Sequence, residues 1–378
     1  MAFRKRNVVL GRPPSDTAPV KESALGVKPS SLSSHTVTST GTPSLDALLG
    51  GHGGLILGSS LLVEESGTTD FSGALLRYYA AQGICHGHTV HIVGVGEHWV
   101  RELPGLLEEK HAGRREVTAS ESERMKIAWR YENVGVVGER GAPAAPSRTI
   151  SSPGREIDTP FQHSFDLSKR LSIPSDAQIH TLQTTPNSTP FESVIHHLER
   201  SLKTSAPNTI HRLVIPTILS PAIYPPHASR PENFTRFLHS LRALLLQYSD
   251  KLTALITIPL ELYPRTSGLI RWAEHLSDGV LELTPFPHLM DASNSLAESG
   301  GARGNEDQPQ GLVHVHKLPV LTEQGEGGAG GENSIGDDLA FTVSRRKFAI
   351  KPFSLPPLEG DQDAQKDAGK LTGKDVEF

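Results

Sequence analysis

The run from residue 61 to 73 has the layout of a phosphate-binding loop between a buried strand and a helix. Such a loop has the pattern G-x-x-x-x-G-K-[ST], because backbone N–H groups and one lysine face the phosphates. We predict the strand at Leu61–Val63 and a helix that begins near Phe71. The eight loop positions are then Glu64, Glu65, Ser66, Gly67, Thr68, Thr69, Asp70 and Phe71.

The residue types at these positions do not suit nucleotide chemistry. Glu64 and Thr69 replace the two glycines, Asp70 replaces the lysine, and Phe71 replaces the hydroxyl that binds magnesium. We expect the carboxylates of Glu64, Glu65 and Asp70 to lie where a triphosphate would bind. Like charges repel at close range, so the site has the wrong sign for phosphate. The sequence therefore predicts a degenerate P-loop that binds no nucleotide.

The residues before the loop argue against a chance strand-turn-helix. Residues 40–51, TGTPSLDALLGG, predict a polar turn and a short apolar helix that ends in glycines. A second turn, Gly58-Ser59, leads directly into the strand. This order resembles the start of the ATPase core in RecA and KaiC-like proteins. The resemblance implies a RecA-like α/β fold with a mostly parallel central sheet flanked by helices.

A second position required for ATP hydrolysis has also changed. Residues 212–215 predict a short buried strand. In an active RecA-type ATPase, this strand ends in an aspartate that holds the water bound to magnesium. Pro216 occupies that position here, as a degenerate Walker B residue. We therefore expect no catalytic residue, no cofactor and no enzyme activity in the chain itself.

The rest of the chain alternates strand and helix patterns. Residues 89–95 predict a buried strand, which completes a βαβ unit with the loop and its helix. Apolar residues fall at helical spacing over 191–202 and 234–245, and a strand pattern follows at 253–258. No helix-length connection separates the last segments, so we predict an antiparallel extension. Its strands are Val280–Leu283, Val313–His316 and Ala340–Val343.

Composition favours one globular core with disordered insertions over two compact domains. The 378 residues are 36% hydrophobic and 6% aromatic, and they include 28 prolines and 35 glycines. We expect a flexible arm at 1–36 and a RecA-like domain at 37–358. Within that domain we expect insertions near 133–160 and 296–336, and beyond it an unstructured tail at 359–378.

Charge and cysteine content limit the function classes. The net charge of −5 excludes a global basic field, so any RNA contact must be local or shared with partners. The single Cys85 excludes an internal disulfide framework and fits a reducing compartment. It lacks the surroundings of a catalytic nucleophile. No apolar run is long enough to cross a membrane, so we expect no membrane partner.

Two short cationic segments are candidates for contact with RNA or with another subunit. They are Lys126, Trp129 and Arg130, and Arg345, Arg346 and Lys347. The alternative for the first is a core tryptophan with a solvated flank, and for the second a solvated end of an edge strand.

Two histidine pairs have spacings that metal sites can use. His314 and His316 alternate on one strand face, and His86 and His88 flank a glycine. Neither pair has a third ligand at a recognisable spacing or a supporting carboxylate. We therefore expect no metal site and take these residues as surface or edge histidines.

Five segments together carry a resemblance to a known family. They are FRKRN at 3–7, MKIAWRYE at 125–132, FDLSK at 165–169, RLVIPTILSPAIYP at 212–225 and LAFTVSRRKFAIKPFSLPP at 339–357. With the TGTPSLDALLGG entry, they resemble the PAXNEB family. The resemblance covers most of the chain but not the first insertion or the tail.

The resemblance implies a RecA-like fold without working Walker motifs and a non-catalytic role in the Elongator complex. The implied partners are the fifth and sixth Elongator subunits, two copies each in a hexameric ring, the catalytic Elongator subcomplex and tRNA. The ring supports the 5-carboxymethyl-type modification of wobble uridines, in the cytoplasm and nucleus. ATP hydrolysis would have to use non-standard sites between subunits.

Two alternatives from other classes remain open. A divergent nucleotidase could use Glu64 or Glu65 as its catalytic carboxylate. A DNA-bound RecA paralogue is the other alternative, and the negative net charge and the lack of a DNA-binding appendage count against it.

Overall fold

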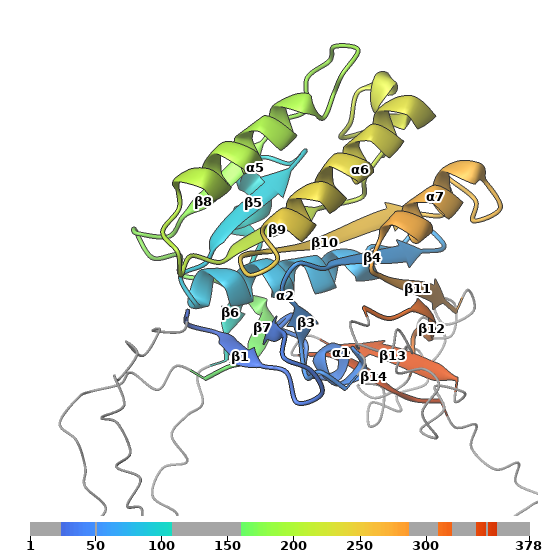
Figure 1. The fold of residues 1–378 in the computed structure, drawn as a ribbon. Helices are drawn as coiled ribbons and strands as arrows, with labels where there is room; N and C mark the ends of the chain where they lie inside the picture. Colours follow the sequence, from blue (N-terminus) through green and yellow to red (C-terminus); the bar gives the residue numbers. More distant parts are fainter. Residues whose placement is uncertain are drawn as a thin grey trace, which may run out of the picture.

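A nine-stranded sheet forms the centre of the computed structural model (Figure 1). The structure describes residues 24–49, 51–107, 160–286, 309–319, 338–344 and 347–353. The strand order is β14-β13-β12-β11-β4-β10-β9-β5-β8. The strands are β4 Ser60–Glu65, β5 Thr89–Val93, β8 Ile179–Leu182, β9 His211–Ile215, β10 Leu252–Pro259, β11 Gly279–Pro285, β12 Gly311–Lys317, β13 Leu339–Val343 and β14 Phe348–Pro352.

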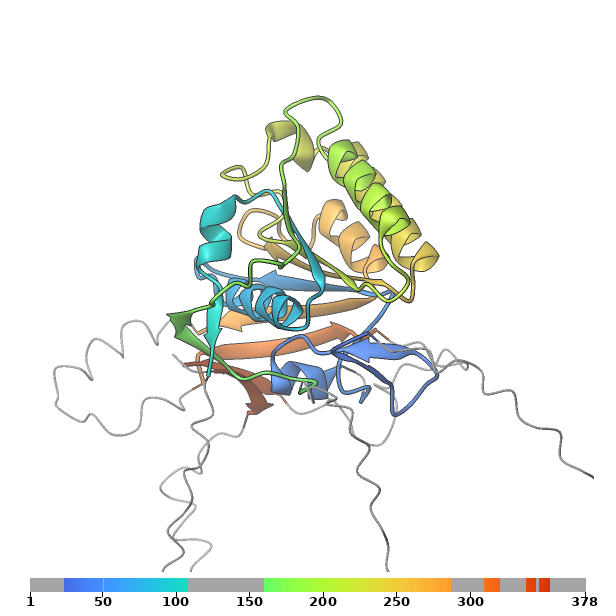
Figure 2. The same cartoon turned by 90° about the vertical axis from the view of Figure 1, so that its left-hand side faces the viewer.

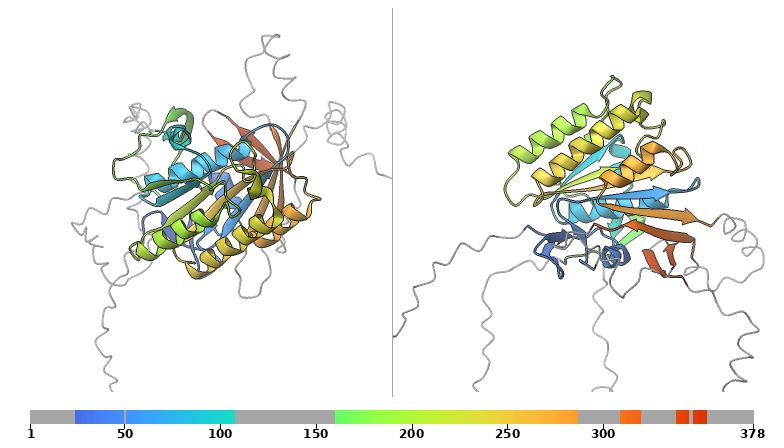
Figure 3. Two further views of the ribbon diagram at one scale, coloured as in Figure 1. Left: turned by 90° about the horizontal axis from the view of Figure 1, so that it is seen from above. Right: turned by 45° about the vertical axis from the view of Figure 1, so that its right-hand side comes forward.

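The pairing divides this sheet into a parallel part and an antiparallel part. All neighbours from β11 to β8 pair in parallel, and β12, β13 and β14 continue the sheet beyond β11 in antiparallel pairing (Figure 3). The predicted antiparallel extension is therefore confirmed. The parallel part requires helical crossovers, which lie on both faces of the sheet.

Helix α2, Phe71–Cys85, covers one face, and three helices cover the other (Figures 1 and 2). These three are α5 Glu192–Thr204, α6 Pro231–Gln247 and α7 Gly268–Leu276. Smaller helical segments are α1 Pro43–Leu48, α3 Glu97–Arg101 and the 3-10 turn Pro226–Ser229. The predicted α/β architecture, a mostly parallel central sheet flanked by helices, is therefore confirmed.

Alternation along β4 assigns its side chains to the two faces. Leu62 packs under α5–α7, whereas Leu61 and Val63 pack against α2. Because both faces are covered, all residues of β4 are buried. Its two terminal residues, Glu64 and Glu65, are therefore buried on opposite faces.

Two small sheets lie beside the large one. The first pairs β1 Val27–Pro29, β2 Thr36–Thr38 and β3 Leu55–Ile56, and the second pairs β6 Pro104–Leu106 with β7 Phe165–Arg170. No helix within the described residues combines the length and apolar character needed to cross a membrane.

Two strands lie within segments that we expected to be disordered. Strand β1 lies inside the expected arm at 1–36, because its backbone pairs with β2. Strand β12 lies inside the expected insertion at 296–336, because it pairs with β11 and β13. The expected insertion near 133–160, apart from its last residue, and the tail at 359–378 lie outside the described residues.

Candidate functional site

The loop between β4 and α2 is shorter than the sequence pattern predicts. Strand β4 continues to Glu65 and α2 begins at Phe71, so the loop itself comprises residues 66–70. Glu64 and Glu65 lie in the strand because both pair with β10 on one side and β11 on the other. The prediction that all eight positions form a loop was wrong for these two residues.

The Glu65 carboxylate lies at the N-terminus of α2. Its Oε1 accepts hydrogen bonds from the Thr69 hydroxyl at 2.8 Å and the Phe71 N–H at 2.9 Å. Its Oε2 accepts from the Ser72 N–H at 2.9 Å and from the Ser72 hydroxyl. A helix N-terminus attracts anions because its first N–H groups lack partners and its dipole is positive there. The chain itself supplies the anion here.

Two further N–H groups of the loop already have protein partners. The Gly67 N–H donates to Glu261 Oε1 at 2.9 Å, and the Ser66 N–H donates to the Leu283 carbonyl at 3.0 Å. Gly67 has φ of 88°, which glycine adopts without strain. Backbone donors that would hold a phosphate are thus bonded to the carboxylates of Glu65 and Glu261.

The other substituted positions point elsewhere. Asp70 has a side chain that is 56% exposed and forms an ion pair with Arg77 at 3.3 Å. The Phe71 ring packs edge-on against Phe341 of β13, with 5.0 Å between ring centroids. Thr68 is exposed in the loop. The prediction that three carboxylates share the phosphate position was wrong, because only Glu65 lies there.

Glu64 lies on the opposite face of the sheet, close to Arg265, Glu274 and Glu282. Its closest ion-pair contact is Arg265 Nε at 3.3 Å. Burial, and secondly the charge of Glu274, raise the pKa of Glu64 to about 8, although Arg265 opposes this shift. Glu282 accepts a hydrogen bond from His316 Nε2 at 2.8 Å. Carboxylates and an imidazole therefore meet here, contrary to the expectation that His316 lacks a supporting carboxylate.

Pro216 directly follows β9, at the position predicted from sequence. Its carbonyl accepts a hydrogen bond from the Tyr224 hydroxyl at 3.1 Å. The next N–H, from Thr217, donates to Thr257 Oγ1 at 2.7 Å. Thr217 and Leu219 have φ of 38° and 69°, which non-glycine residues rarely adopt. The backbone after β9 is therefore held in an unusual conformation by Tyr224 and Thr257.

Comparison with known proteins identifies the family. Residues 20–378 match the sequence profile of the family described as PAXNEB protein. The chain belongs to the PAXNEB protein family.

Relatives of this PAXNEB chain come from distant eukaryotes. It is 36% identical to Elongator complex protein 4 of Schizosaccharomyces pombe, over 90% of this chain and 91% of that protein. It is 28% identical to Elongator complex protein 4 of Saccharomyces cerevisiae, over 90% and 78%, and of Homo sapiens, over 91% and 82%. A solved KaiC-like protein of Pyrococcus horikoshii OT3 aligns at TM-score 0.42 and 14% identity, covering 84% of this chain and 100% of that chain.

Most of the cationic candidates of the PAXNEB chain lie outside the described residues. These are Lys126, Trp129, Arg130, Arg345 and Arg346. Lys347 is exposed, in the turn between β13 and β14, where its N–H donates to Ser344 Oγ at 3.2 Å. Its role in RNA or subunit contact stays a prediction.

Sequence reasoning missed the buried Arg212 of β9, which is 0% exposed. Its guanidinium donates to the carbonyls of Ser39 and Tyr79 at 2.9 and 3.0 Å. It also donates to Thr38 Oγ1 at 2.7 Å and His88 Nδ1 at 3.0 Å. Arg212 thus joins β9 to α2, to the end of β2 and to the turn between α2 and β5. The apolar neighbours of Arg212 in the sequence gave no signal of this role.

The histidines beside Arg212 are buried, not at the surface or an edge as expected. His86 Nε2 lies 3.0 Å from the Pro160 carbonyl, and His88 Nε2 lies 2.7 Å from the Leu25 carbonyl. Burial lowers the pKa of His86 to about 4 and the pKa of His88 well below its usual value. Burial also raises the pKa of the Cys85 thiol to about 11, which disfavours a reactive thiolate.

A cluster of four histidines lies under α5: His91, His180, His197 and His211. Neighbouring ring centroids are 5.1 to 5.6 Å apart, and His91 Nε2 lies 3.0 Å from His211 Nδ1. Burial lowers the pKa of His91 well below its usual value and the pKa of His211 to about 4. Sequence spacing missed this cluster because its members come from β5, β8, α5 and β9.

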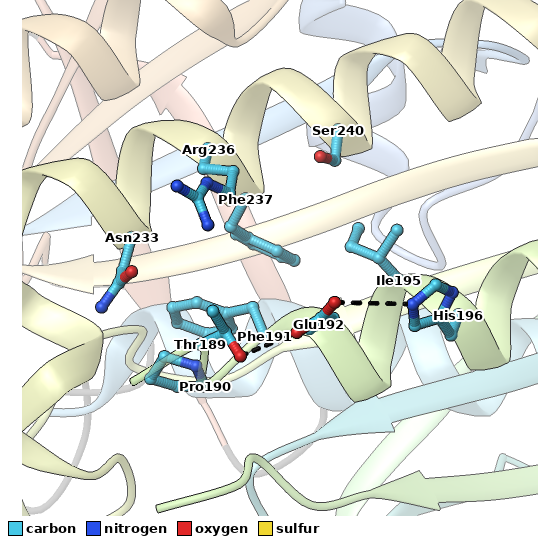
Figure 4. Close-up of a pocket in the computed structure, with 10 residues that line it drawn as sticks. All are labelled: Thr189, Pro190, Phe191, Glu192, Ile195, His196, Asn233, Arg236, Phe237 and Ser240. Carbon is cyan, nitrogen blue, oxygen red and sulfur yellow. Dashed lines mark hydrogen bonds and ion pairs between the residues drawn. The ribbon is translucent and has the colours of Figure 1, made fainter. Parts of the chain in front are cut away.

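A surface pocket lies between α5 and α6 (Figure 4). Its lining residues are Thr189, Pro190, Phe191, Glu192, Ile195, His196, Asn233, Arg236, Phe237 and Ser240. Glu192 accepts from the Thr189 hydroxyl at 2.7 Å and lies 3.8 Å from His196 Nε2. The pocket contains none of the residues predicted as a site from sequence.

Proposed function

We propose that this chain is a non-catalytic subunit of the Elongator complex. The relatives named Elongator complex protein 4 support membership of that complex. The observation that carries the non-catalytic role is the Glu65 carboxylate, which accepts hydrogen bonds from Thr69, Phe71 and Ser72 at the start of α2. A triphosphate would have to displace that carboxylate, and no lysine stands in the loop to compensate.

In this proposal the chain contributes one RecA-like subunit to a hexameric accessory ring. The partners are the fifth and sixth Elongator subunits, the catalytic subcomplex and tRNA, whose wobble uridines are modified. The protein acts in the cytoplasm and the nucleus. ATP hydrolysis by the ring, where it occurs, uses sites between subunits and not the β4–α2 loop.

Co-expression with the fifth and sixth subunits tests the assembly. Native mass measurement should give one hexamer with two copies of each subunit, and this hexamer should bind tRNA with an affinity that falls as salt rises. A stable monomer that leaves the other two subunits unbound contradicts the assembly proposal.

The nucleotidase alternative places the catalytic carboxylate at Glu64 or Glu65. Four donors already bond to the two oxygens of Glu65, which leaves this carboxylate poorly suited to activate a water. Glu64 lies on the other face of the sheet from the loop. The purified chain should therefore show no turnover of Mg·ATP. Turnover that Glu65→Gln abolishes and that Glu232→Gln, a control at an exposed glutamate of α6, retains would favour the nucleotidase.

A further inference from the structure

Three side chains from neighbouring strands meet on the sheet face covered by α5–α7. They are Glu64 of β4, Glu282 of β11 and His316 of β12, and one ligand atom of each lies within 4.8 Å of the other two. Glu64 and Glu282 are direct partners in the parallel pairing. His316 is the extra residue at a bulge, since Val315 and Lys317 pair with consecutive residues of β11. A bulge re-aims a side chain, and here it brings the imidazole to Glu282.

The charges around this cluster do not balance. Among the described residues, Glu64, Glu274 and Glu282 face the guanidinium of Arg265, which leaves a charge of −2 when all three carboxylates are ionised and His316 is neutral. The raised pKa of Glu64 means that a proton offsets one of these charges at neutral pH when no cation is bound. Glu64 is 0% exposed, and neither of its oxygens has a hydrogen-bond partner among the described residues. A buried carboxylate without hydrogen bonds is costly unless a cation compensates it.

Arg265 compensates this charge only in part. Its Nε lies 2.6 Å from Glu274 but 3.3 Å from Glu64, and its Nη1 lies 3.6 Å from Glu282. The side chain of Arg265 is 37% exposed. It can therefore stay on Glu274 while a second cation takes the oxygens of Glu64 and Glu282.

We propose that Glu64, Glu282 and His316 bind one divalent transition-metal ion of the zinc class. Tetrahedral zinc bound at about 2.0–2.1 Å places its ligand atoms about 3.4 Å apart. A separation at the 4.8 Å limit therefore has to close by about 1.4 Å, whereas the 2.8 Å contact between His316 Nε2 and Glu282 Oε2 has to open by about 0.6 Å. An imidazole with two carboxylates suits zinc better than magnesium or calcium, which prefer oxygen ligands alone. A water completes the four ligands.

The ion has an entry route and a structural consequence. The side chains of His316 and Glu282 are 25% and 16% exposed, so this side of the cluster is open to solvent. The bound ion would join β4 and β11 of the parallel sheet to β12, the first strand of the antiparallel extension. It would thus fix the extension, whose Phe341 packs on Phe71 at the start of α2.

Calorimetric titration of the untagged full chain with Zn²⁺ tests the site. The wild type should show a site with one ion per chain, and Mg²⁺ at the same concentration should not compete. His316→Ala should weaken this site about tenfold or more, and so should Glu282→Gln. His239→Ala, at an exposed histidine of α6, is the matched control and should leave the affinity unchanged.

Thermal unfolding provides the second measurement. Zn²⁺ should raise the Tm of the wild type and of His239→Ala but not of His316→Ala. We expect His316→Ala to fold, because the His316 side chain is partly exposed and lies on the solvent side of the cluster. Glu64→Gln should also show no rise in Tm with Zn²⁺. If Glu64→Gln does not fold, the result for His316→Ala alone tests the proposal. Equal Zn²⁺ affinity in the wild type and His316→Ala overturns the proposal. So does a loss of Zn²⁺ affinity in His239→Ala as large as that in His316→Ala.

Discussion

Two neighbouring residues of β4, Glu64 and Glu65, show how differently the two faces of the sheet treat a buried carboxylate. Glu65 faces α2 and accepts four hydrogen bonds from residues at the start of that helix. Glu64 faces α5–α7, where neither of its oxygens has a hydrogen-bond partner among the described residues. The first carboxylate completes the start of a helix, whereas the second has an ion pair with Arg265 at 3.3 Å in place of hydrogen bonds.

Arg212 and the histidine cluster show the same contrast. On the α2 face, Arg212 donates hydrogen bonds from all three of its guanidinium nitrogens. On the other face, His91 and His211 bond to each other, while His91 Nδ1 and His211 Nε2 have no partner within the described chain. Buried polar groups stabilise a fold only when their partners are present. Of these two groups, the hydrogen bonds of Arg212 therefore contribute more to stability.

Loss of Arg212 should have the largest effect on stability. Arg212→Met should lower the free energy of unfolding by about 3–5 kcal/mol, because it leaves buried carbonyls and His88 without donors. The control is Arg242→Met, at a side chain that is 40% exposed and lies 3.8 Å from Asp278, which should cost less than about 1 kcal/mol. Urea denaturation measures both. An equal loss of unfolding free energy in Arg212→Met and Arg242→Met would show that the buried hydrogen bonds of Arg212 do not add to stability.

Substitution of the two carboxylates should separate the faces directly. Glu65→Ala should lower the free energy of unfolding by about 2–3 kcal/mol, because it removes the acceptor for the first N–H groups of α2. Glu64→Gln should stay within about 1 kcal/mol of the wild type when metal is absent, because Arg265 keeps Glu274 as a partner. Urea denaturation with a chelator measures both changes. A larger loss of stability in Glu64→Gln than in Glu65→Ala would contradict the proposed difference between the two faces.

Acid should act on the face that holds the histidine cluster. The pKa of His211 is lowered from 6.5 to about 4 by burial, so the unfolded chain binds more protons between these values. The stability that neutral His211 contributes is therefore fully present above pH 6.5 and is lost as pH falls toward 4. Buried His91 of the same cluster also has a lowered pKa and adds to this loss. His86 and His88, beside Arg212 on the α2 face, have lowered pKa values and add a further contribution from that face.

A single substitution isolates the contribution of His211. His211→Asn keeps an amide near the position of Nδ1 but does not titrate, so it should remove about 2 kcal/mol of the stability lost between pH 7 and pH 5. His196→Asn is the control, because the His196 side chain is 65% exposed. Urea denaturation at the two pH values measures the difference. An unchanged acid loss in His211→Asn would contradict the assignment.

The smallest effect is expected at Asp70. Asp70→Lys restores the residue type of a phosphate-binding loop, but the side chain is 56% exposed and points toward Arg77. It should change stability by less than about 1 kcal/mol and should create no measurable Mg·ATP binding. Binding titration with Mg·ATP checks this, with Asp70→Ala as the control. Tight binding by Asp70→Lys would show that the loop donors remain available.

Local residue patterns predicted most of the fold. The continuous apolar runs of β5, β9 and β10 and the helical spacing of α5 and α6 are local, and the structure contains all of them. Strand β8 and helix α7 were missed because β8 is half exposed and α7 has only nine residues. Strand β1 was missed because its pairing with β2, and not its own composition, defines it.

The candidate site was predicted less well, because its contacts are not local. The residue types at Glu65, Asp70 and Pro216 could be read directly from the sequence. The separation of Glu64 from Glu65 depends on where β4 ends, and that is set by pairing with β10 and β11. The approach of His316 to Glu282 depends on a bulge between two strands, which spacing along the chain does not reveal.

Rescue by inorganic phosphate tests most directly the claim that Glu65 occupies the phosphate position. Unfolding in urea is measured with and without millimolar phosphate at constant ionic strength, for the wild type, Glu65→Ala and the control Glu64→Gln. Phosphate should raise the free energy of unfolding of Glu65→Ala alone, by about 0.5 kcal/mol or more, because only that variant leaves the N–H groups of α2 free to bind the ion. An equal rise in the wild type would show that the position is open and would contradict the account.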